Sequence, residues 1–196
     1  MSGLMTDEEM MQALKDSNAI RTGHFVLTSG RHSDTYVQCA RVLEDPGLTT
    51  RLAETAVRRL PAGLGVDLVA APAVGGIIFG FAVAQALGVK FIFSEREHGA
   101  MVFRRAFEVP QDANVLVVED VVTTGGSVKE VIDLVEAAGA TVAGVVSMID
   151  RGGEKAFDGA FWPLLQLEVE SWTPDSCGLC TDGVPVHSPG SRRIGG

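Results

Sequence analysis

The stretch that decides the fold is Val115-Leu116-Val117-Val118-Glu119-Asp120-Val121-Val122-Thr123-Thr124-Gly125-Gly126-Ser127. Four consecutive apolar residues predict a strand that is buried on both faces, and the Thr/Gly/Ser run predicts a turn that opens a helix. Such a turn exposes backbone N–H groups, supplies hydroxyls and lies at the positive end of a helix dipole. The pattern therefore predicts a phosphate cradle.

Two carboxylates, Glu119 and Asp120, end the predicted strand. Open parallel sheets bind their ligands at this end of the strands. Because carboxylates repel a phosphate, the pair must face another group, and the vicinal hydroxyls of a sugar are natural hydrogen-bond donors. The alternative is an acidic turn and a capped helix without a ligand. The order of all the residues from 115 to 127 favours the cradle over this alternative.

Helix and strand signals alternate on both sides of this stretch. Strands are expected at 67–71, 90–93, 114–118 and 141–149, and helices at 76–87 and 126–138. Apolar strands that alternate with helices predict an α/β fold with a parallel sheet covered on both faces. Gly139 fits the end of the second helix.

The first 60 residues carry a different pattern. Thr6 and Glu9 form a capping box that predicts a first helix, and Asp45-Pro46 predicts the start of another over 48–60. Short strands are expected at 25–27 and 36–38 around a turn at Ser29-Gly30. Near the other end, the prolines and glycines after Trp172 predict an irregular tail.

Composition excludes several classes of protein. The chain has 196 residues, of which 46% are hydrophobic and 21% charged, as in ordinary globular domains. A net charge of -9 argues against nonspecific binding to nucleic acid or to an anionic membrane. Three cysteines are too few for a secreted disulfide framework, and acidic residues precede any apolar run, so we expect a cytoplasmic protein.

One uncharged segment, Leu68 to Val89, is long enough to suggest a membrane span. Pro72 and the Gly75-Gly76 pair interrupt it. A buried strand, a turn and a buried helix explain the segment better than a membrane helix does.

The cradle and the acidic pair resemble the phosphoribosyl pyrophosphate signature of type I phosphoribosyltransferases. In addition, the segment from Phe25 to Tyr36, Phe-Val-Leu-Thr-Ser-Gly-Arg-His-Ser-Asp-Thr-Tyr, resembles the hood motif of orotate phosphoribosyltransferases. The resemblance extends almost to the C-terminus. It implies a single phosphoribosyltransferase domain over 1–196, in which a small N-terminal hood of about residues 1–45 and the irregular C-terminal tail accompany the sheet.

The resemblance also implies an activity. A phosphoribosyl group would pass from phosphoribosyl pyrophosphate to orotate, giving orotidine 5′-monophosphate and pyrophosphate in pyrimidine synthesis. Mg²⁺ would be the cofactor, bound mainly by substrate oxygens and water because magnesium dehydrates reluctantly. We assign no direct protein ligand to this ion, and we expect a homodimer.

Site residues follow from the matched motifs. Glu119, Asp120 and the cradle from Val121 to Ser127 would bind the phosphate and ribose, and a turn at Ala73, Val74, Gly75 and Gly76 would bind pyrophosphate. Orotate would contact Ser29, Gly30, Arg31 and Arg151, whose planar guanidinium suits a carboxylate and its neighbouring carbonyl. Arg96, His98 and Asp120 would be catalytic.

The sequence departs from the family pattern at three positions. Val74-Gly75 stands where Tyr-Lys is better known, Thr28 replaces a lysine, and no lysine lies between Lys90 and Lys129. Arg96, Arg104 and Arg105 are the available replacements for a loop lysine, although surface charge alone also explains the last two. We expect the stretch from Glu95 to Arg105 to be a mobile lid that reaches the active site of a partner subunit.

Cysteines raise the question of a metal. Cys177-Gly-Leu-Cys180, with Cys39 and His187 elsewhere, offers zinc ligands. A closed structural site needs four ligands, and the chain has one CxxC pair, so two reduced tail thiols are the favoured interpretation.

Two other functions share parts of the pattern. A purine phosphoribosyltransferase would have the cradle without the hood or Arg151. A nucleotide-sensing regulator that binds RNA or DNA would keep the fold, although the net charge of -9 and the lack of a basic stripe count against it.

Overall fold

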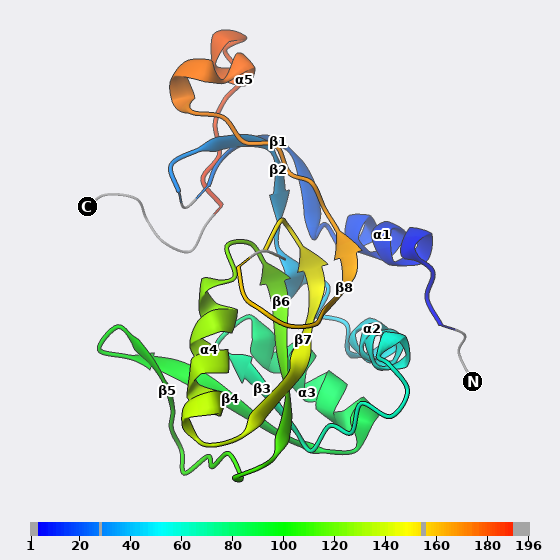
Figure 1. Cartoon of the computed structure of the whole chain (residues 1–196). Coiled ribbons are helices and arrows are strands. Elements are labelled where there is room, and N and C mark those ends of the chain that lie inside the picture. Colours follow the sequence, from blue (N-terminus) through cyan, green and yellow to red (C-terminus); the bar gives the residue numbers. More distant parts are fainter. Residues whose placement is uncertain (1–3, 28, 154–155, 190–196) are drawn as a thin grey trace.

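The computed structural model describes residues 4–27, 29–153 and 156–189, and its centre is a six-stranded sheet with the order β5-β4-β3-β6-β7-β8 (Figure 1). All neighbouring strands are parallel except the pair β4 and β5. The strands are β3 (Leu68–Pro72), β4 (Lys90–Glu97), β5 (Ala100–Phe103), β6 (Asn114–Val122), β7 (Thr141–Asp150) and β8 (Phe161–Gln166). The predicted α/β class with a parallel sheet is therefore confirmed.

Helices cover both faces of the sheet. Helices α2 (Pro46–Arg59) and α3 (Gly76–Leu87) pack on one face, and α4 (Gly126–Ala137) packs on the other (Figure 1). Along β6, Leu116 and Val118 belong to the first hydrophobic core, whereas Val115 and Val117 belong to the second. Side chains alternate between the faces of a strand, so a strand with both faces covered is apolar throughout.

The first helix, α1 (Asp7–Asp16), begins at the predicted capping box between Thr6 and Glu9. Its buried residues Met10 and Leu14 lie in the same core as α2 and α3. Although α1 falls within the first 45 residues, it therefore packs as part of the main domain.

The hood consists of the antiparallel hairpin β1 (Ile20–Val26) and β2 (His32–Val37) together with the C-terminal tail. It stands over the end of the sheet where β6 and β7 finish (Figure 1). The tail follows both edges of the hairpin, since His32 exchanges backbone hydrogen bonds with Trp172, and the backbone N–H of Val26 donates to the backbone oxygen of His187. Thr28, one of the departures from the family pattern, lies outside the described residues.

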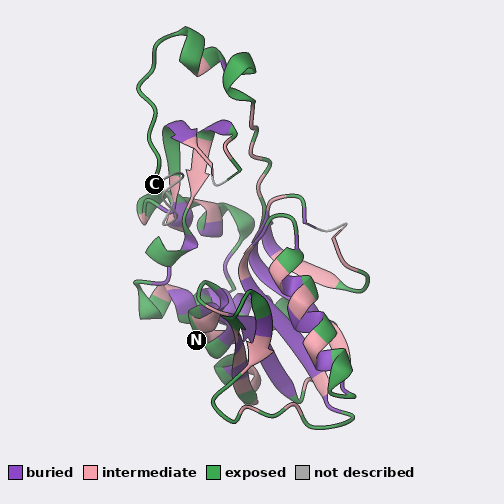
Figure 2. Ribbon diagram, turned by 90° about the vertical axis from the view of Figure 1, so that its left-hand side faces the viewer, coloured by how far each residue is buried: buried purple, intermediate pink, exposed green. Residues whose placement is uncertain are grey.

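Burial differs between these two parts of the molecule. Buried residues concentrate in the main sheet and the inner faces of its helices, whereas the hood and tail are mostly intermediate or exposed (Figure 2). In the part of the chain that the structure describes, no helix has both the length and the apolar character needed to cross a membrane. The segment 68–89 is instead β3, a turn and α3.

Three expectations about local structure were incomplete. β8 was not predicted, and the stretch from Glu95 to Arg105, expected to be a mobile lid, contains most of the β-hairpin formed by β4 and β5. The tail, expected to be irregular, also contains the short helix α5 (Gly178–Thr181).

Candidate active site

The site lies at the point in the sheet where successive strands change from being added on one side of β3 to being added on the other. The chain passes from β3 outward to β4 and then returns to the other side of β3 to form β6. In such sheets the crevice between the two central strands is open at their carboxyl ends, and ligands bind there. The ends of β3 and β6 carry the predicted pyrophosphate turn and the predicted cradle. Two motifs that are far apart in the sequence are thus neighbours.

The cradle forms as expected from its composition. Gly125 adopts the left-handed conformation with φ 68°, and helix α4 starts at Gly126 without a side-chain cap on its free N–H groups. Glu119 and residues 121–128 line a pocket of about 70 Å³, which has room for a group several times larger than water, such as a phosphate. Free N–H groups and the helix dipole make this pocket a site for an anion.

The acidic pair lies beside the cradle at the end of β6. Glu119 is buried and accepts a hydrogen bond at Oε1 from the backbone N–H of Asp120, 3.0 Å away. Asp120 is partly exposed and accepts one at Oδ1 from Val121 N–H, 2.8 Å away. Burial, with the neighbouring charge of Asp120, raises the pKa of Glu119 well above its usual range. The pair therefore combines a more exposed carboxylate with a buried carboxyl that resists ionisation.

The turn from Ala73 to Gly76 packs directly on this pair. A Cβ at Gly75 would lie 2.6 Å from Oδ1 of Asp120, and one at Gly76 would lie 3.1 Å from Oε1 of Glu119. Gly75 has an ordinary right-handed backbone, with φ -57° and ψ -46°. Glycine is therefore required there by the close approach of the carboxylate, and not by its backbone torsions.

Arg151 reaches the site from the adjacent strand, β7. Its backbone N–H donates to Val122 O at 2.8 Å, and buried Asp150 holds the following turn by accepting from the N–H groups of Gly152 and Gly153. Burial lowers the pKa of the Arg151 guanidinium. Its Nε is buried and has no hydrogen-bond partner among the described residues. A buried donor without a partner suits a residue that awaits an anionic ligand.

A pocket of about 360 Å³ adjoins this arginine, within the range of small-molecule sites. It extends from 150–152 along residues 166–170, at the end of β8 and just beyond it. Arg151 is the basic residue among the described residues that line the pocket, whereas Glu168 and Glu170 at the far end are acidic, and the carboxylate of Asp150 beside the arginine is occupied by the N–H groups of Gly152 and Gly153. An anionic ligand would therefore bind at the arginine end of the pocket.

Cys39 lies next to the site, although the sequence did not predict that position for it. Its buried Sγ lies 4.0 Å from the backbone oxygen of Asp120. Burial, and then the charges of Asp120 and Glu119, raise the pKa of this thiol well above its usual range. Cys39 is therefore an inert packing residue below the acidic pair, and no local sequence signal marks it.

Hydrogen bonds to the tail hold the exposed Arg31 of the hood turn in place. Gly30 has φ 76° and its N–H donates to Leu27 O at 2.8 Å, which closes the turn. Arg31 donates from Nε to Ser171 Oγ at 2.9 Å and also to the backbone oxygen of Ser171. The predicted orotate residues of the hood, Ser29 to Arg31, are thus fastened to the tail.

Arg96 and His98 are not brought to the cradle. Arg96 forms an ion pair with Glu130 of α4, at 2.6 Å, and donates to Gly99 O, while exposed His98 lies in the tip of the β4–β5 hairpin. The segment expected to be a mobile lid also contacts its own domain, because Met101 is buried in the second core. The predicted catalytic role of both residues remains a prediction.

Arg104 and Arg105 carry surface charge in this structure. They pair with Glu97 at 3.5 Å and with Glu95 at 2.9 Å on the facing strand. This arrangement is the alternative that the sequence left open for both residues. Positive charge for the pyrophosphate turn is therefore not supplied by either of them here.

Comparison with known proteins identifies the class. The family model described as phosphoribosyl transferase domain matches residues 41–173. That range includes the turn at 73–76, the acidic pair, the cradle and Arg151. The fold and the site define a phosphoribosyltransferase.

Individual relatives narrow this class. The chain is 48% identical over 190 residues to an orotate phosphoribosyltransferase of Heliobacterium modesticaldum, covering 96% of this chain and 100% of the relative. It is 50% identical over 191 residues to that of Chlorobaculum parvum, covering 96% and 97%. The crystal structure of the Aeropyrum pernix enzyme of the same name superposes with a TM-score of 0.63 at 25% identity, covering 91% of each chain. The chain belongs to the orotate phosphoribosyltransferase family.

Proposed function

We propose that this protein transfers the phosphoribosyl group of phosphoribosyl pyrophosphate to orotate, giving orotidine 5′-monophosphate and pyrophosphate. The observation that carries the proposal is the meeting of the cradle, the acidic pair and the pyrophosphate turn at one edge of the sheet, with Arg151 on the next strand. Curated relatives at 48% and 50% identity over almost the whole chain are named orotate phosphoribosyltransferase, which supports the proposal.

Binding starts from the cradle. The N–H groups at the start of α4 and the hydroxyls of Thr123, Thr124 and Ser127 would donate to the 5′-phosphate. The first turn of α4 contains no acidic residue, and Glu119, which also lines the pocket, resists ionisation because its pKa is raised, so repulsion of the dianion is small. The cradle thereby holds one end of the substrate and fixes the position of the ribose.

The acidic pair would act on the ribose. The Asp120 carboxylate and the carboxyl oxygens of Glu119 would accept hydrogen bonds from the two vicinal hydroxyls, which a phosphate could not provide. As the bond from the anomeric carbon to pyrophosphate breaks, positive charge develops on the sugar, and the anionic Asp120 stabilises it. Such stabilisation acts on the transition state more than on the bound substrate.

Magnesium fits the donors at this place. Pyrophosphate bound at the turn 73–76 would lie against the Asp120 carboxylate, because that carboxylate approaches Gly75 too closely to admit a Cβ. Two neighbouring anions need a cation between them, and carboxylate, phosphate and water oxygens are the ligands that Mg²⁺ prefers. Asp120 would be the nearest protein group to the ion, and the ion would neutralise charge on the leaving group.

Orotate would be held by Arg151, which follows β7, the strand next to the one that carries the acidic pair. The unpartnered Nε and the planar fork suit a carboxylate next to a ring carbonyl. The ring nitrogen of orotate loses its proton to water or to the departing pyrophosphate and forms the new bond to the anomeric carbon. Apart from this one proton, the step needs no proton transfer, so positioning and electrostatics supply most of the acceleration.

A homodimer is part of the proposal. Val74, Ile78 and Phe81 are 82%, 51% and 58% exposed, and they form an apolar surface on the pyrophosphate turn and α3. Exposed apolar surfaces of this kind mark contacts with other proteins, and a second copy of this chain is the occupant that we propose. Dimerisation would place the partner's hairpin near this turn.

The hairpin tip can then act as the proposed lid. The ion pair between Arg96 and Glu130 is 43% and 40% exposed, and exposed pairs contribute about 0–1 kcal/mol, so little holds Arg96 in this position. Mixing subunits that carry Arg96→Ala with subunits that carry Asp120→Asn tests whether the lid is shared. Recovery of activity is expected if one subunit's Arg96 serves the other's Asp120. A heterodimer that is confirmed by mass and stays inactive would contradict a shared lid.

A cytoplasmic location is also proposed. All three cysteines are unpaired in the structure. Thiols stay reduced in the cytosol, whereas exported proteins more often contain disulfides.

Base choice is the experiment that tests the proposal. Pyrophosphate release is measured with phosphoribosyl pyrophosphate, Mg²⁺ and, in turn, orotate, hypoxanthine and uracil. Of the three bases, orotate is the one with which pyrophosphate release is expected. Release with hypoxanthine alone would indicate the purine enzyme, and thermal stabilisation by RNA without any release would indicate the regulator.

A further inference from the structure

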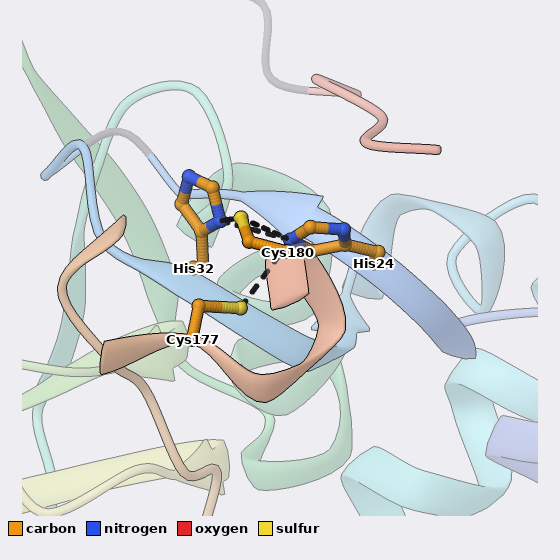
Figure 3. A group of neighbouring side chains, drawn as sticks. All are labelled: His24, His32, Cys177 and Cys180. Carbon is orange, nitrogen blue, oxygen red and sulfur yellow. Dashed lines mark hydrogen bonds between the residues drawn. The ribbon is translucent and has the colours of Figure 1, made fainter. Parts of the chain in front are cut away.

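Four side chains that play no part in the proposed reaction converge inside the hood. They are His24 of β1, His32 of β2, and Cys177 and Cys180 of the tail (Figure 3). The ligand atoms, one from each residue, all lie within 4.8 Å of one another. The sulfur of Cys180 lies 3.2 Å from Nδ1 of His32, and the sulfur of Cys177 lies 3.5 Å from Nε2 of His24.

Hydrogen bonds between these groups cannot account for the cluster. Nδ1 of His24 donates to Val184 O at 2.8 Å, which leaves a single lone pair on Nε2. Three groups approach that nitrogen, since Nδ1 of His32 is 2.8 Å away and the sulfurs of Cys177 and Cys180 are 3.5 and 3.7 Å away. One lone pair accepts one hydrogen bond. Two of the three groups that approach Nε2 of His24 are therefore left without a hydrogen bond to it.

We propose that His24, His32, Cys177 and Cys180 bind a structural Zn²⁺ ion. A tetrahedral zinc ion with ligands at about 2.0–2.3 Å separates two nitrogens by about 3.3 Å and a nitrogen from a sulfur by about 3.5 Å. The nitrogen–sulfur distances of 3.2, 3.5 and 3.7 Å match this geometry. The two histidine nitrogens, now 2.8 Å apart, need to separate by about 0.5 Å.

Charge and second contacts also suit zinc. Two thiolates and two neutral imidazoles balance the charge of a divalent ion, so the complex is neutral inside the hood, and the two thiol protons are released on binding. The hydrogen bond from His24 to Val184 O fixes the tautomer that presents Nε2, as outer contacts of metal-binding histidines commonly do. Four protein ligands leave no open position, so the role is structural and not catalytic.

The hood needs such a site because it has little core of its own. Its sheet has two strands, and its buried apolar residues Phe25 and Cys177 belong to neither hydrophobic core of the main domain. An isolated hairpin is marginally stable in water, and small modules are commonly stabilised by a metal. Zinc would tie both strands of the hairpin to the tail.

This link bears on the active site. His32 directly follows the hood turn Ser29 to Arg31, and Arg31 is already fastened to Ser171 of the tail. Holding the tail on the hairpin therefore holds the turn in one position over the sheet. This consequence rests on the proposed function, whereas the metal site itself does not.

The first experiment measures bound metal. Untagged full-length protein is saturated with Zn²⁺, desalted, and analysed by elemental mass spectrometry. We expect about one zinc ion per chain for the wild type and a large loss for Cys180→Ser, which changes the most exposed ligand. His187→Ala is the matched control. His187 belongs to the tail and lies beside Phe25, outside the cluster, so this variant should keep its zinc.

The second experiment needs no variant and so does not depend on the folding of one. Replacing zinc by Co²⁺ in the wild type should give the intense visible absorption of a tetrahedral site with thiolate-to-cobalt charge transfer. A wild type that binds no zinc and shows no such spectrum, or in which Cys177 and Cys180 form a disulfide under reducing conditions, would overturn the metal site. Zinc binding without orotate-dependent turnover would instead refute the proposed function and leave the site intact.

Discussion

Replacing Gly75 with alanine places a methyl group against the acidic pair. The new Cβ would lie 2.6 Å from Oδ1 of Asp120, whereas ordinary contact begins at 3.4 Å, so the turn and the carboxylate must separate by about 0.8 Å. Misplacing a catalytic group by about 1 Å costs on the order of 10²-fold in rate. We therefore expect turnover to fall by about 10²-fold, equivalent to about 2.7 kcal/mol of transition-state stabilisation.

The fold should survive this change. Gly75 has right-handed torsions that alanine adopts easily, and the turn is at the surface. Steady-state pyrophosphate release and thermal melting are measured for Gly75→Ala and for Gly178→Ala, where a Cβ meets nothing within 4 Å. The control should keep its activity. Full turnover by folded Gly75→Ala would refute the argument that the turn and Asp120 form one site.

Three further changes test individual residues. Arg151→Lys keeps the charge but loses the planar fork, so the KM for orotate should rise about tenfold or more while that for phosphoribosyl pyrophosphate hardly changes; equal losses would point to a structural role. Thr124→Val removes one hydrogen bond to the phosphate and should weaken phosphoribosyl pyrophosphate by about 1.5–3 kcal/mol in calorimetry, and unchanged affinity would exclude this residue. The raised pKa of Glu119 means that the folded state favours its protonated form, so stability is lost as pH rises through that pKa. Glu119→Gln should therefore melt above the wild type at neutral pH, with the difference vanishing below about pH 4, the range of an unfolded carboxyl; a less stable variant at neutral pH would contradict this reading.

Sequence patterns predicted the elements that local chemistry delimits. The bounds of α3, Gly76–Leu87, match the expectation because Gly75-Gly76 and Gly88 punctuate a continuous apolar run. The cradle was predicted for the same reason, since strand, carboxylates, turn and helix follow each other without interruption. Elements of this kind carry all their determinants within a few residues.

Elements that depend on distant partners were missed. β8 contains Pro163, which argues against a strand, but β8 is an edge strand where one missing N–H is tolerated. The end of β4, Glu95 to Glu97, extends past β3 and pairs with the edge strand β5 alone, so its charged residues give no apolar signal for a strand.

The Cys₂His₂ cluster escaped the sequence because its parts are far apart. His24 and His32 are eight residues apart around a turn, and Cys177 and Cys180 follow about 150 residues later. The ligands considered first with the tail cysteines, Cys39 and His187, lie outside the cluster of four. Only the docking of the tail on both edges of the hairpin brings the pairs together.

The most direct measurement of the central claim is the product itself. Wild type and Asp120→Asn are incubated with orotate, phosphoribosyl pyrophosphate and Mg²⁺, and orotidine 5′-monophosphate and pyrophosphate are quantified together by mass spectrometry and an enzyme-coupled assay. The account predicts equal amounts of both products from the wild type, and a loss of turnover in Asp120→Asn that exceeds its loss of affinity for phosphoribosyl pyrophosphate. Unconsumed orotate with the folded wild type, or full turnover by Asp120→Asn, would contradict it.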